Sequence, residues 1–195
     1  MLGFGEHPGT QGPGSRSAQT VLHEILDTLL RLLAPVLSFT ADEAWQHMPA
    51  RKEQSVHLAA FPLLHPEWKD DSLVERWERI MRVRADVSKS LELARAAKTI
   101  GHSLDAAVTI AAPAELLGFL RTYEAELQSI FIVSKVVLAD SISGEGWDSE
   151  NIAGLKVRVA AAPGDKCERC WCYSEELGTV AEHPSICPKC TAAVL

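Results

Sequence analysis

The residues with the clearest chemistry in this sequence are its five cysteines. Cys167 and Cys170 form one Cys-x-x-Cys unit, Cys187 and Cys190 form a second, and sixteen residues separate the two units. Two thiolates at this spacing form a knuckle that presents both sulfurs to one ion, and two knuckles complete a tetrahedral four-sulfur site. Thiolates favour zinc, and a closed four-sulfur shell leaves no position open for catalysis. The spacing therefore predicts one structural Zn²⁺ held by these four cysteines.

Two other interpretations of the cysteine cluster are a pair of redox-active dithiols and a chance grouping. A redox Cys-x-x-Cys motif begins a helix after a buried strand, and the duplication argues against chance. Cys172 and His183 lie near the knuckles, but four sulfurs already satisfy the ion, so we expect both to be bystanders. Residues 1–166 contain no cysteine, and this distribution indicates a reducing compartment, the cytoplasm, rather than a secreted disulfide scaffold.

The side chains around the knuckles suggest contact with a nucleic acid. Trp171 directly follows the first knuckle, and its ring can either pack over the metal site or stack on an RNA base. Lys166, Arg169 and Lys189 flank the sulfurs. They offset the net double negative charge of a zinc ion held by four thiolates. The knuckle edge is therefore expected to be close to neutral.

Composition and motifs exclude several classes of protein. The chain has 195 residues, a formal net charge of -7, 47% hydrophobic residues and 23% charged residues. These values are typical of a globular protein, and they exclude a mostly disordered chain and a wholly basic nucleic-acid binder. The sequence contains no Gly-x-x-x-x-Gly-Lys loop and no nucleophile-elbow serine, so no catalytic residue is predicted. No apolar stretch approaches the roughly 20 residues that span a bilayer.

The elements that must position these residues fall into successive blocks. Residues 1–15 are rich in glycine and proline, and we expect an expression leader there. Apolar residues then recur at helical spacing through residues 16–101. This pattern predicts helices over about 18–34, 40–48 and 71–98, with a capping box at Thr40 and Glu43 and a C-cap at Gly101. The helical block is followed by a small α/β unit over residues 102–162 and the zinc module over 163–195. The fold class expected is mainly α.

The long helix predicted over residues 71–98 carries most of the positive charge. Between Ser72 and Ile100 there are seven basic and four acidic residues, a net charge of +3 in an acidic chain. Arg79, Arg82 and Lys89 lie on roughly one side of this helix and are candidates for contact with RNA phosphates. A solvated helical face is the alternative explanation for these three cations.

Several segments resemble a known enzyme family. The sequence LAPVLSFTADEAW at residues 33–45 and VHLAAFP at residues 56–62 are similar to the anticodon-binding bundle of class I aminoacyl-tRNA synthetases. KCERCW at residues 166–171 and CPKC at residues 187–190 resemble the C-terminal zinc module of bacterial isoleucyl-tRNA synthetases. The resemblance runs from about Arg16 to the end of the sequence.

The resemblance implies a parent enzyme that joins isoleucine to its tRNA with ATP, and a chain that binds the anticodon arm. The family's His-x-Gly-His-type and Lys-Met-Ser-Lys-Ser motifs are absent. We therefore expect a C-terminal part without the catalytic and editing domains and without the first helices of the bundle. The expected partners are isoleucine-specific tRNA and the catalytic body of the parent chain. No membrane partner is expected, and the protein is expected to be a monomer.

Two rival functions remain open at this point. Formamidopyrimidine-type DNA glycosylases carry a similar double knuckle, although this sequence shows neither their N-terminal proline nucleophile nor their helix-two-turn-helix. A zinc module that only docks on the body of its own parent is the other alternative. Binding of isoleucine tRNA at low and moderate salt distinguishes this docking module from an anticodon-binding one.

Overall fold

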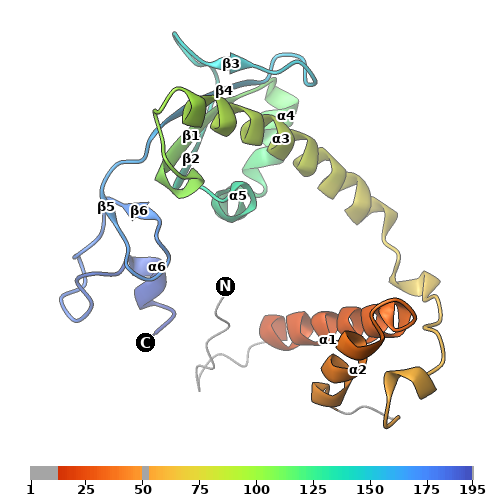
Figure 1. Cartoon of the computed structure of the whole chain (residues 1–195). Coiled ribbons are helices and arrows are strands. Elements are labelled where there is room, and N and C mark those ends of the chain that lie inside the picture. Colours follow the sequence, from red (N-terminus) through yellow and green to blue (C-terminus); the bar gives the residue numbers. More distant parts are fainter. Residues whose placement is uncertain (1–12, 50–52, 195) are drawn as a thin grey trace. The chain divides into compact units, whose positions relative to one another are not determined.

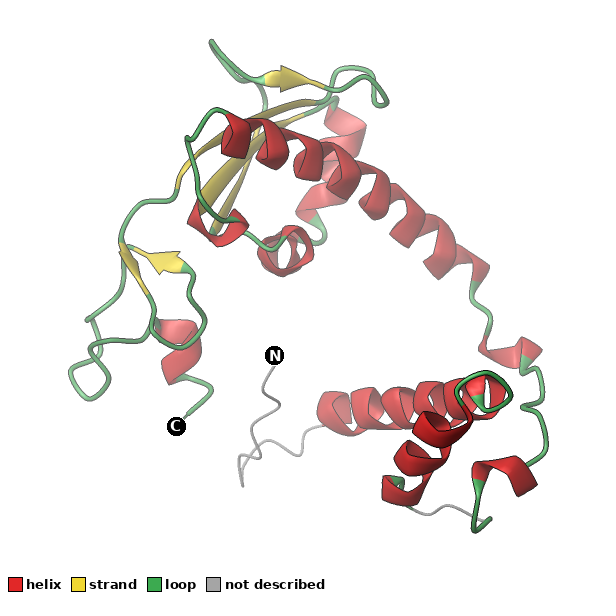
Figure 2. Ribbon diagram, viewed as in Figure 1, coloured by secondary structure: helices red, strands yellow, loops and turns green. Residues whose placement is uncertain are grey.

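The computed structural model describes residues 13–49 and 53–194, which belong to two compact units (Figure 1). The first unit extends to Lys69 and the second begins at Asp70. The first contains only helical elements, whereas the second combines helices with strands (Figure 2). Among the described residues, no helix has both the length and the apolar character needed to cross a bilayer.

The first unit consists of two α-helices and two short 3-10 helices. Its elements are α1 (Pro13–Leu33), α2 (Ser38–His47), η1 (Val56–Leu58) and η2 (Pro66–Trp68). α1 ends two residues before Pro35, which lacks the N–H that a continuing helix needs. α2 begins after Leu37 without any side-chain cap, so the capping box expected at Thr40 and Glu43 is wrong. The helix forms instead because Ala41 and Trp45 bury one of its faces.

The core of the first unit is small, and it leaves much of α1 exposed. Its buried members are Leu30, Ala34, Ala41, Trp45, Met48 and Val56. The apolar stripe expected along α1 is present, but side chains such as Val21, Ile25 and Leu29 remain 46–54% exposed. α1 begins at Pro13, so residues 13–15 of the expected leader are helical. Residues 1–12 lie outside the described part.

The second unit is built around a four-stranded mixed sheet. Its strand order is β2-β1-β4-β3, with β1 (Ala106–Ala111) parallel to β2 (Lys135–Ala139) and antiparallel to β4 (Lys156–Ala161). The short strand β3 (Trp147–Asp148) pairs with β4. Helices α4 (Ala114–Arg121) and α5 (Glu124–Phe131) form the crossover that a parallel β1–β2 pair requires (Figure 1). A 3-10 turn, η3 (Ser103–Asp105), leads into β1.

Helix α3 (Asp71–Ala96) packs on this sheet. Asp70 caps its N-terminus by accepting a hydrogen bond from the backbone N–H of Leu73. From its midpoint onward, the helix contributes Val83, Val87, Leu91 and Ala94 to the core of the second unit. The helix ends at Ala96, and Lys98 takes the left-handed conformation (φ 59°), so the C-cap expected at Gly101 is wrong.

Helix α3 belongs to the second compact unit. The helical block was expected to extend to residue 101, but α3 forms one compact unit with the sheet. A buried carboxylate explains part of this attachment. Asp86 on α3 is 1% exposed and accepts hydrogen bonds from Ser149 Oγ at 2.5 Å and Asn151 Nδ2 at 3.0 Å. These contacts join α3 to the connection between β3 and β4.

Candidate metal centre

The first knuckle is the loop of a short hairpin. Strand β5 (Asp165–Lys166) pairs with β6 (Tyr173–Ser174), and residues 167–172 connect them. The backbone N–H of Cys167 donates to the carbonyl of Cys172, and that of Trp171 donates to the carbonyl of Cys167, both at 2.9 Å. These bonds curl the loop so that both knuckle sulfurs are held close together.

The entry to this hairpin requires a glycine. Gly164 has φ +89°, a conformation that residues with a Cβ rarely adopt. A Cβ at this position would lie 2.3 Å from the backbone carbonyl of Ser174. β6 therefore passes so close to Gly164 that no side chain fits between them. Gly164 is therefore part of the framework of the first knuckle.

The second knuckle begins a short helix. Cys187 precedes α6 (Pro188–Thr191), and its carbonyl accepts hydrogen bonds from the N–H groups of Cys190 and Thr191, both at 2.9 Å. Its own N–H points at the first knuckle, donating to Cys167 Sγ at 3.3 Å. The two knuckles thus meet through a backbone-to-sulfur contact as well as through their side chains.

The four predicted sulfurs form one cluster. Cys167, Cys170, Cys187 and Cys190 place their Sγ atoms within 4.8 Å of one another. Zinc–sulfur bonds of about 2.3 Å in a tetrahedron require neighbouring sulfurs about 3.8 Å apart. The Cys170 and Cys187 sulfurs are 3.8 Å apart. The donor set and its spacing therefore fit one structural zinc ion.

The pKa values of the four cysteine thiols are shifted in different directions. Burial raises the pKa of Cys170 to about 12, and it also raises the pKa of Cys187. Burial acts in the same sense on Cys167, but hydrogen bonds from backbone amides, those of Cys170, Cys187 and Arg169, outweigh it and lower the pKa of Cys167 to about 6. These amides stabilise one thiolate, whereas a metal ion must displace the protons of the other sulfurs.

Two other candidate ligands lie outside the cluster. Neither Cys172 nor His183 belongs to the four-residue group that could hold an ion in the described part of the chain. Cys172 supports the knuckle loop through its backbone carbonyl, which accepts a hydrogen bond from the N–H of Cys167. The backbone N–H of His183 donates to the Val180 carbonyl at 3.0 Å in the turn between the knuckles.

Trp171 has an exposed side chain on a strained backbone. Its φ is +64°, in the left-handed region that is uncommon for residues other than glycine. The side chain is 62% exposed, so most of the indole faces solvent. A residue held in a sparsely populated conformation at a surface is a candidate for a functional role.

The cations near the knuckles differ in their surroundings. Arg169 lies between the two cysteines of the first knuckle and is exposed. Burial raises the pKa of Cys190, and a hydrogen bond from the Arg169 side chain to this sulfur partly counteracts the effect. Lys189 lies on α6 and is exposed, as is Lys166 at the end of β5. Arg169 thus favours the thiolate form of Cys190, in keeping with its expected role beside the sulfurs.

The predicted cations of α3 are also unlike one another. Arg79 forms an ion pair with Glu115 at 2.7 Å, and its guanidinium carbon lies 4.6 Å from the centre of the Phe119 ring. Arg82 and Lys89 are exposed on the same helix. The Arg79 side chain therefore packs against α4, whereas the other two side chains face solvent.

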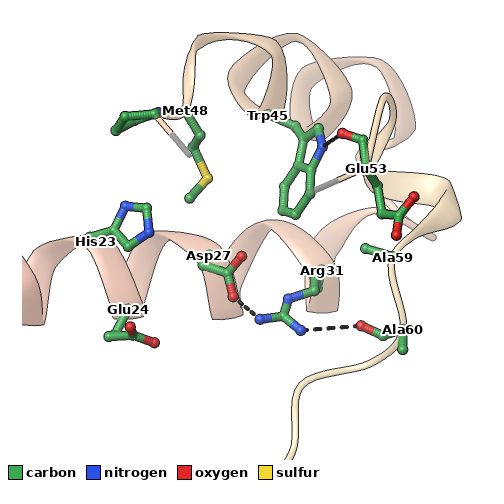
Figure 3. Close-up of a pocket in the computed structure, with 10 residues that line it drawn as sticks. His23, Glu24, Asp27, Arg31, Trp45, Met48, Glu53, Ala59 and Ala60 are labelled. Atoms are coloured by element: carbon green, nitrogen blue, oxygen red, sulfur yellow. Dashed lines mark hydrogen bonds and ion pairs between the residues drawn. The ribbon is translucent and has the colours of Figure 1, made fainter. Parts of the chain in front are cut away.

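The first unit contains a separate cavity of about 320 Å³ between α1, α2 and the segment that follows them (Figure 3). Asp27 and Arg31 on α1 form an ion pair at its wall, and Arg31 also donates to the Ala60 carbonyl at 3.4 Å. Trp45 Nε1 donates to the Glu53 carbonyl at 3.0 Å. The polar groups of this cavity tie the connecting segment to the helices.

Two family models match the chain. The model described as "Anticodon-binding domain of tRNA ligase" matches residues 5–110, more than half of the chain. The model described as "Zinc finger found in FPG and IleRS" matches residues 164–193, which contain both knuckles. The first match begins within the segment that was expected to be a leader.

Curated relatives resemble nearly the whole chain. The isoleucine–tRNA ligase of Geobacter sulfurreducens is 62% identical over 182 residues, which are 93% of this chain and 20% of the relative. The ligase of the same name from Syntrophotalea carbinolica is 49% identical over 95% of the chain, and that of Caldanaerobacter subterraneus subsp. tengcongensis is 47% identical over 92%. The chain spans 20% of the length of each of these relatives.

Proposed function

The chain belongs to the family of anticodon-binding domains of tRNA ligases, and on this premise we propose that it is the C-terminal, tRNA-binding part of an isoleucine–tRNA ligase. The observation that carries the proposal is the 62% identity to such a ligase across 93% of the chain. The whole enzyme would join isoleucine to its tRNA with ATP in the cytoplasm. This part would bind the anticodon arm without contributing a catalytic residue.

In this proposal the zinc ion is structural. Cys167, Cys170, Cys187 and Cys190 hold it, and its role is to fix the two knuckles relative to each other. The zinc-finger description names both FPG and IleRS, whereas the model that matches residues 5–110 is described as a domain of tRNA ligase. This difference favours a ligase over a DNA glycosylase.

RNA would be held by two kinds of contact. Single-stranded anticodon bases are recognised by stacking on aromatic side chains, and the exposed ring of Trp171 suits this role. Arg169 and Lys189 lie on the same module and would approach nearby phosphates. Arg82 and Lys89 on α3 would contact the RNA backbone, with a smaller contribution from Arg79 because Glu115 already neutralises it.

The sharpest test compares two tryptophans with the same exposure. Trp171 and Trp68 are both 62% exposed, but Trp68 lies in the first unit, where its ring stacks on His65. Trp171→Ala should weaken binding of an isoleucine anticodon stem-loop by about 1–3 kcal/mol, the value of one stacked base. Trp68→Ala should lose less affinity than Trp171→Ala, because the Trp68 ring already stacks on His65.

The assay is fluorescence anisotropy with labelled stem-loop RNA at two salt concentrations. Equal affinities for Trp171→Ala and the unmodified chain would remove Trp171 from the interface. Absence of RNA binding by the unmodified chain at low salt would favour the alternative of a zinc module that only docks on its own parent. The adenylation assay is complementary: the purified chain should show no isoleucine-dependent pyrophosphate exchange.

A further inference from the structure

Ser134 connects the sheet of the second unit to the metal module. It lies between α5 and β2 and is 5% exposed. Its N–H donates to the Ala106 carbonyl at 3.0 Å, and its own carbonyl accepts from Gln128 Nε2. Its hydroxyl donates to the Leu104 carbonyl and accepts from the backbone N–H of Tyr173 at 2.7 Å. Every polar group of this buried residue is thus used.

The bond to Tyr173 reaches the base of the first knuckle. Tyr173 is the first residue of β6, the strand that returns from the knuckle loop, and it pairs with Lys166 at the end of β5. Only one residue separates it from Trp171 in the chain. The Ser134 hydroxyl therefore joins the sheet directly to the strand that carries the exposed indole.

Two other contacts hold the module, but neither fixes its orientation as well. The N–H of Ala162 donates to the Asp105 carbonyl at 2.7 Å, where the chain leaves β4, before the Pro163-Gly164 turn. Lys135 and Glu175 form an ion pair whose side chains are 46% and 59% exposed, and such surface pairs are weak. The buried bond of Ser134 is the strong contact beyond the turn.

From these contacts we infer that Ser134 is a positioning residue, which fixes the first knuckle, and with it Trp171, in one orientation relative to the sheet. The consequence for RNA binding rests on the proposed function. The fixed orientation itself does not depend on the proposed function, because it follows from hydrogen bonds within the chain. Without the hydroxyl, the hairpin is free to pivot about Gly164 while its zinc site stays intact.

The test uses a matched pair of serine substitutions in the full chain. Ser134→Ala removes a buried hydroxyl with two partners, whereas Ser90→Ala removes one that is 4% exposed and has no hydrogen-bond partner among the described residues. Residual dipolar couplings of backbone amides report the orientation of residues 165–190 relative to the sheet. Ser134→Ala should change these couplings and keep one equivalent of zinc, and Ser90→Ala should change neither.

A double-mutant cycle connects orientation to RNA binding. Ser134→Ala should weaken stem-loop binding by about tenfold, because RNA binding must then order an indole that is no longer held in one orientation. In the Trp171→Ala background it should weaken binding by less than about twofold, because its effect is transmitted through that indole. Equal losses in both backgrounds would contradict transmission through Trp171.

The outcomes separate the inference from the proposed function. Unchanged couplings in Ser134→Ala overturn the inference, whatever the RNA does. Binding that is insensitive to Trp171→Ala overturns the proposed RNA contact, while the couplings still decide the role of Ser134. If Ser134→Ala does not fold, hydrogen exchange of the Tyr173 amide in the unmodified chain gives the answer. Slow exchange supports the bond, and exchange as fast as in an open loop overturns it.

Discussion

Removing zinc should unfold the segment after Pro163 and leave the sheet and α3 folded. The apolar cluster of this segment consists of three buried cysteines, with Cys170, Leu177 and Ile186 packed partly against them. Ordering the backbone costs about 1–2 kcal/mol per residue, and the segment has about thirty ordered residues. Burial of two aliphatic side chains does not offset this cost. Structural zinc contributes on the order of 10 kcal/mol or more at neutral pH in small modules. The ion is therefore the main source of stability here.

Metal binding should also depend steeply on pH, because protons compete with the ion for the sulfurs. Burial raises the pKa of Cys170 to about 12, and it raises those of Cys187 and Cys190 above the ordinary thiol value. These three thiols are protonated at neutral pH without metal, so binding displaces at least three protons. The apparent affinity should rise at least about a thousandfold per pH unit from about pH 6 to 8, and fall correspondingly on acidification.

The assay combines metal analysis with hydrogen exchange detected by mass spectrometry, before and after dialysis against a chelator. Cys187→Ala should lose the ion, whereas Cys172→Ala should retain one equivalent because its sulfur lies outside the cluster. Affinities are measured by competition with a chromophoric chelator across the pH range. Continued protection of residues 165–190 in metal-free protein would refute the stability argument. An affinity that rises about a hundredfold per pH unit or less would refute the assignment of three protonated thiols.

Gly164→Ala should disrupt the knuckle hairpin and lower its zinc content, because the new Cβ would lie 2.3 Å from the backbone of β6. Gly178→Ala is its control. Gly178 also has a positive φ of +80°, but a Cβ added there would lie 3.7 Å from its nearest neighbour, the Pro184 carbonyl oxygen. Zinc should therefore be retained. Arg82→Ala should reduce the slope of log affinity against log salt for RNA by about one, and an unchanged slope would place this residue outside the interface. The first unit should lose stability as the pH falls below about 4, because hydrogen bonds, chiefly from the Ser55 hydroxyl, lower the pKa of Asp42 and favour its ionised form. Thermal melts of Asp42→Ala should show a weaker dependence on pH over this range.

Local patterns account for the parts of this protein that the sequence reveals. The metal cluster depends on two cysteines with two residues between them in each knuckle, and the structure brings the two predicted pairs together. The helices α1, α2 and α3 follow apolar spacing and prolines that operate over one or two turns. The small α/β unit expected over residues 102–162 contains the crossover helices and the strands β1, β2 and β4.

Long-range partners account for what the sequence does not reveal. Ser134 and Tyr173 are 39 positions apart, and neither belongs to a motif. The attachment of α3 to the sheet depends on Asp86 and its partners near residue 150, which no periodicity connects. The capping box at Thr40 fails for a related reason, since burial of Trp45 decides where α2 lies.

The backbone conformation of Trp171 has a consequence for selection experiments. Its left-handed φ of +64° is one that glycine adopts without strain. In a library screened only for heat resistance, glycine at this position should therefore be enriched, and in one screened for RNA capture it should be depleted. Opposing selection at a single codon is the pattern of a residue retained for its contacts at the expense of stability. Sequencing both libraries would measure, in enrichment ratios, how far recognition outweighs folding at the knuckle.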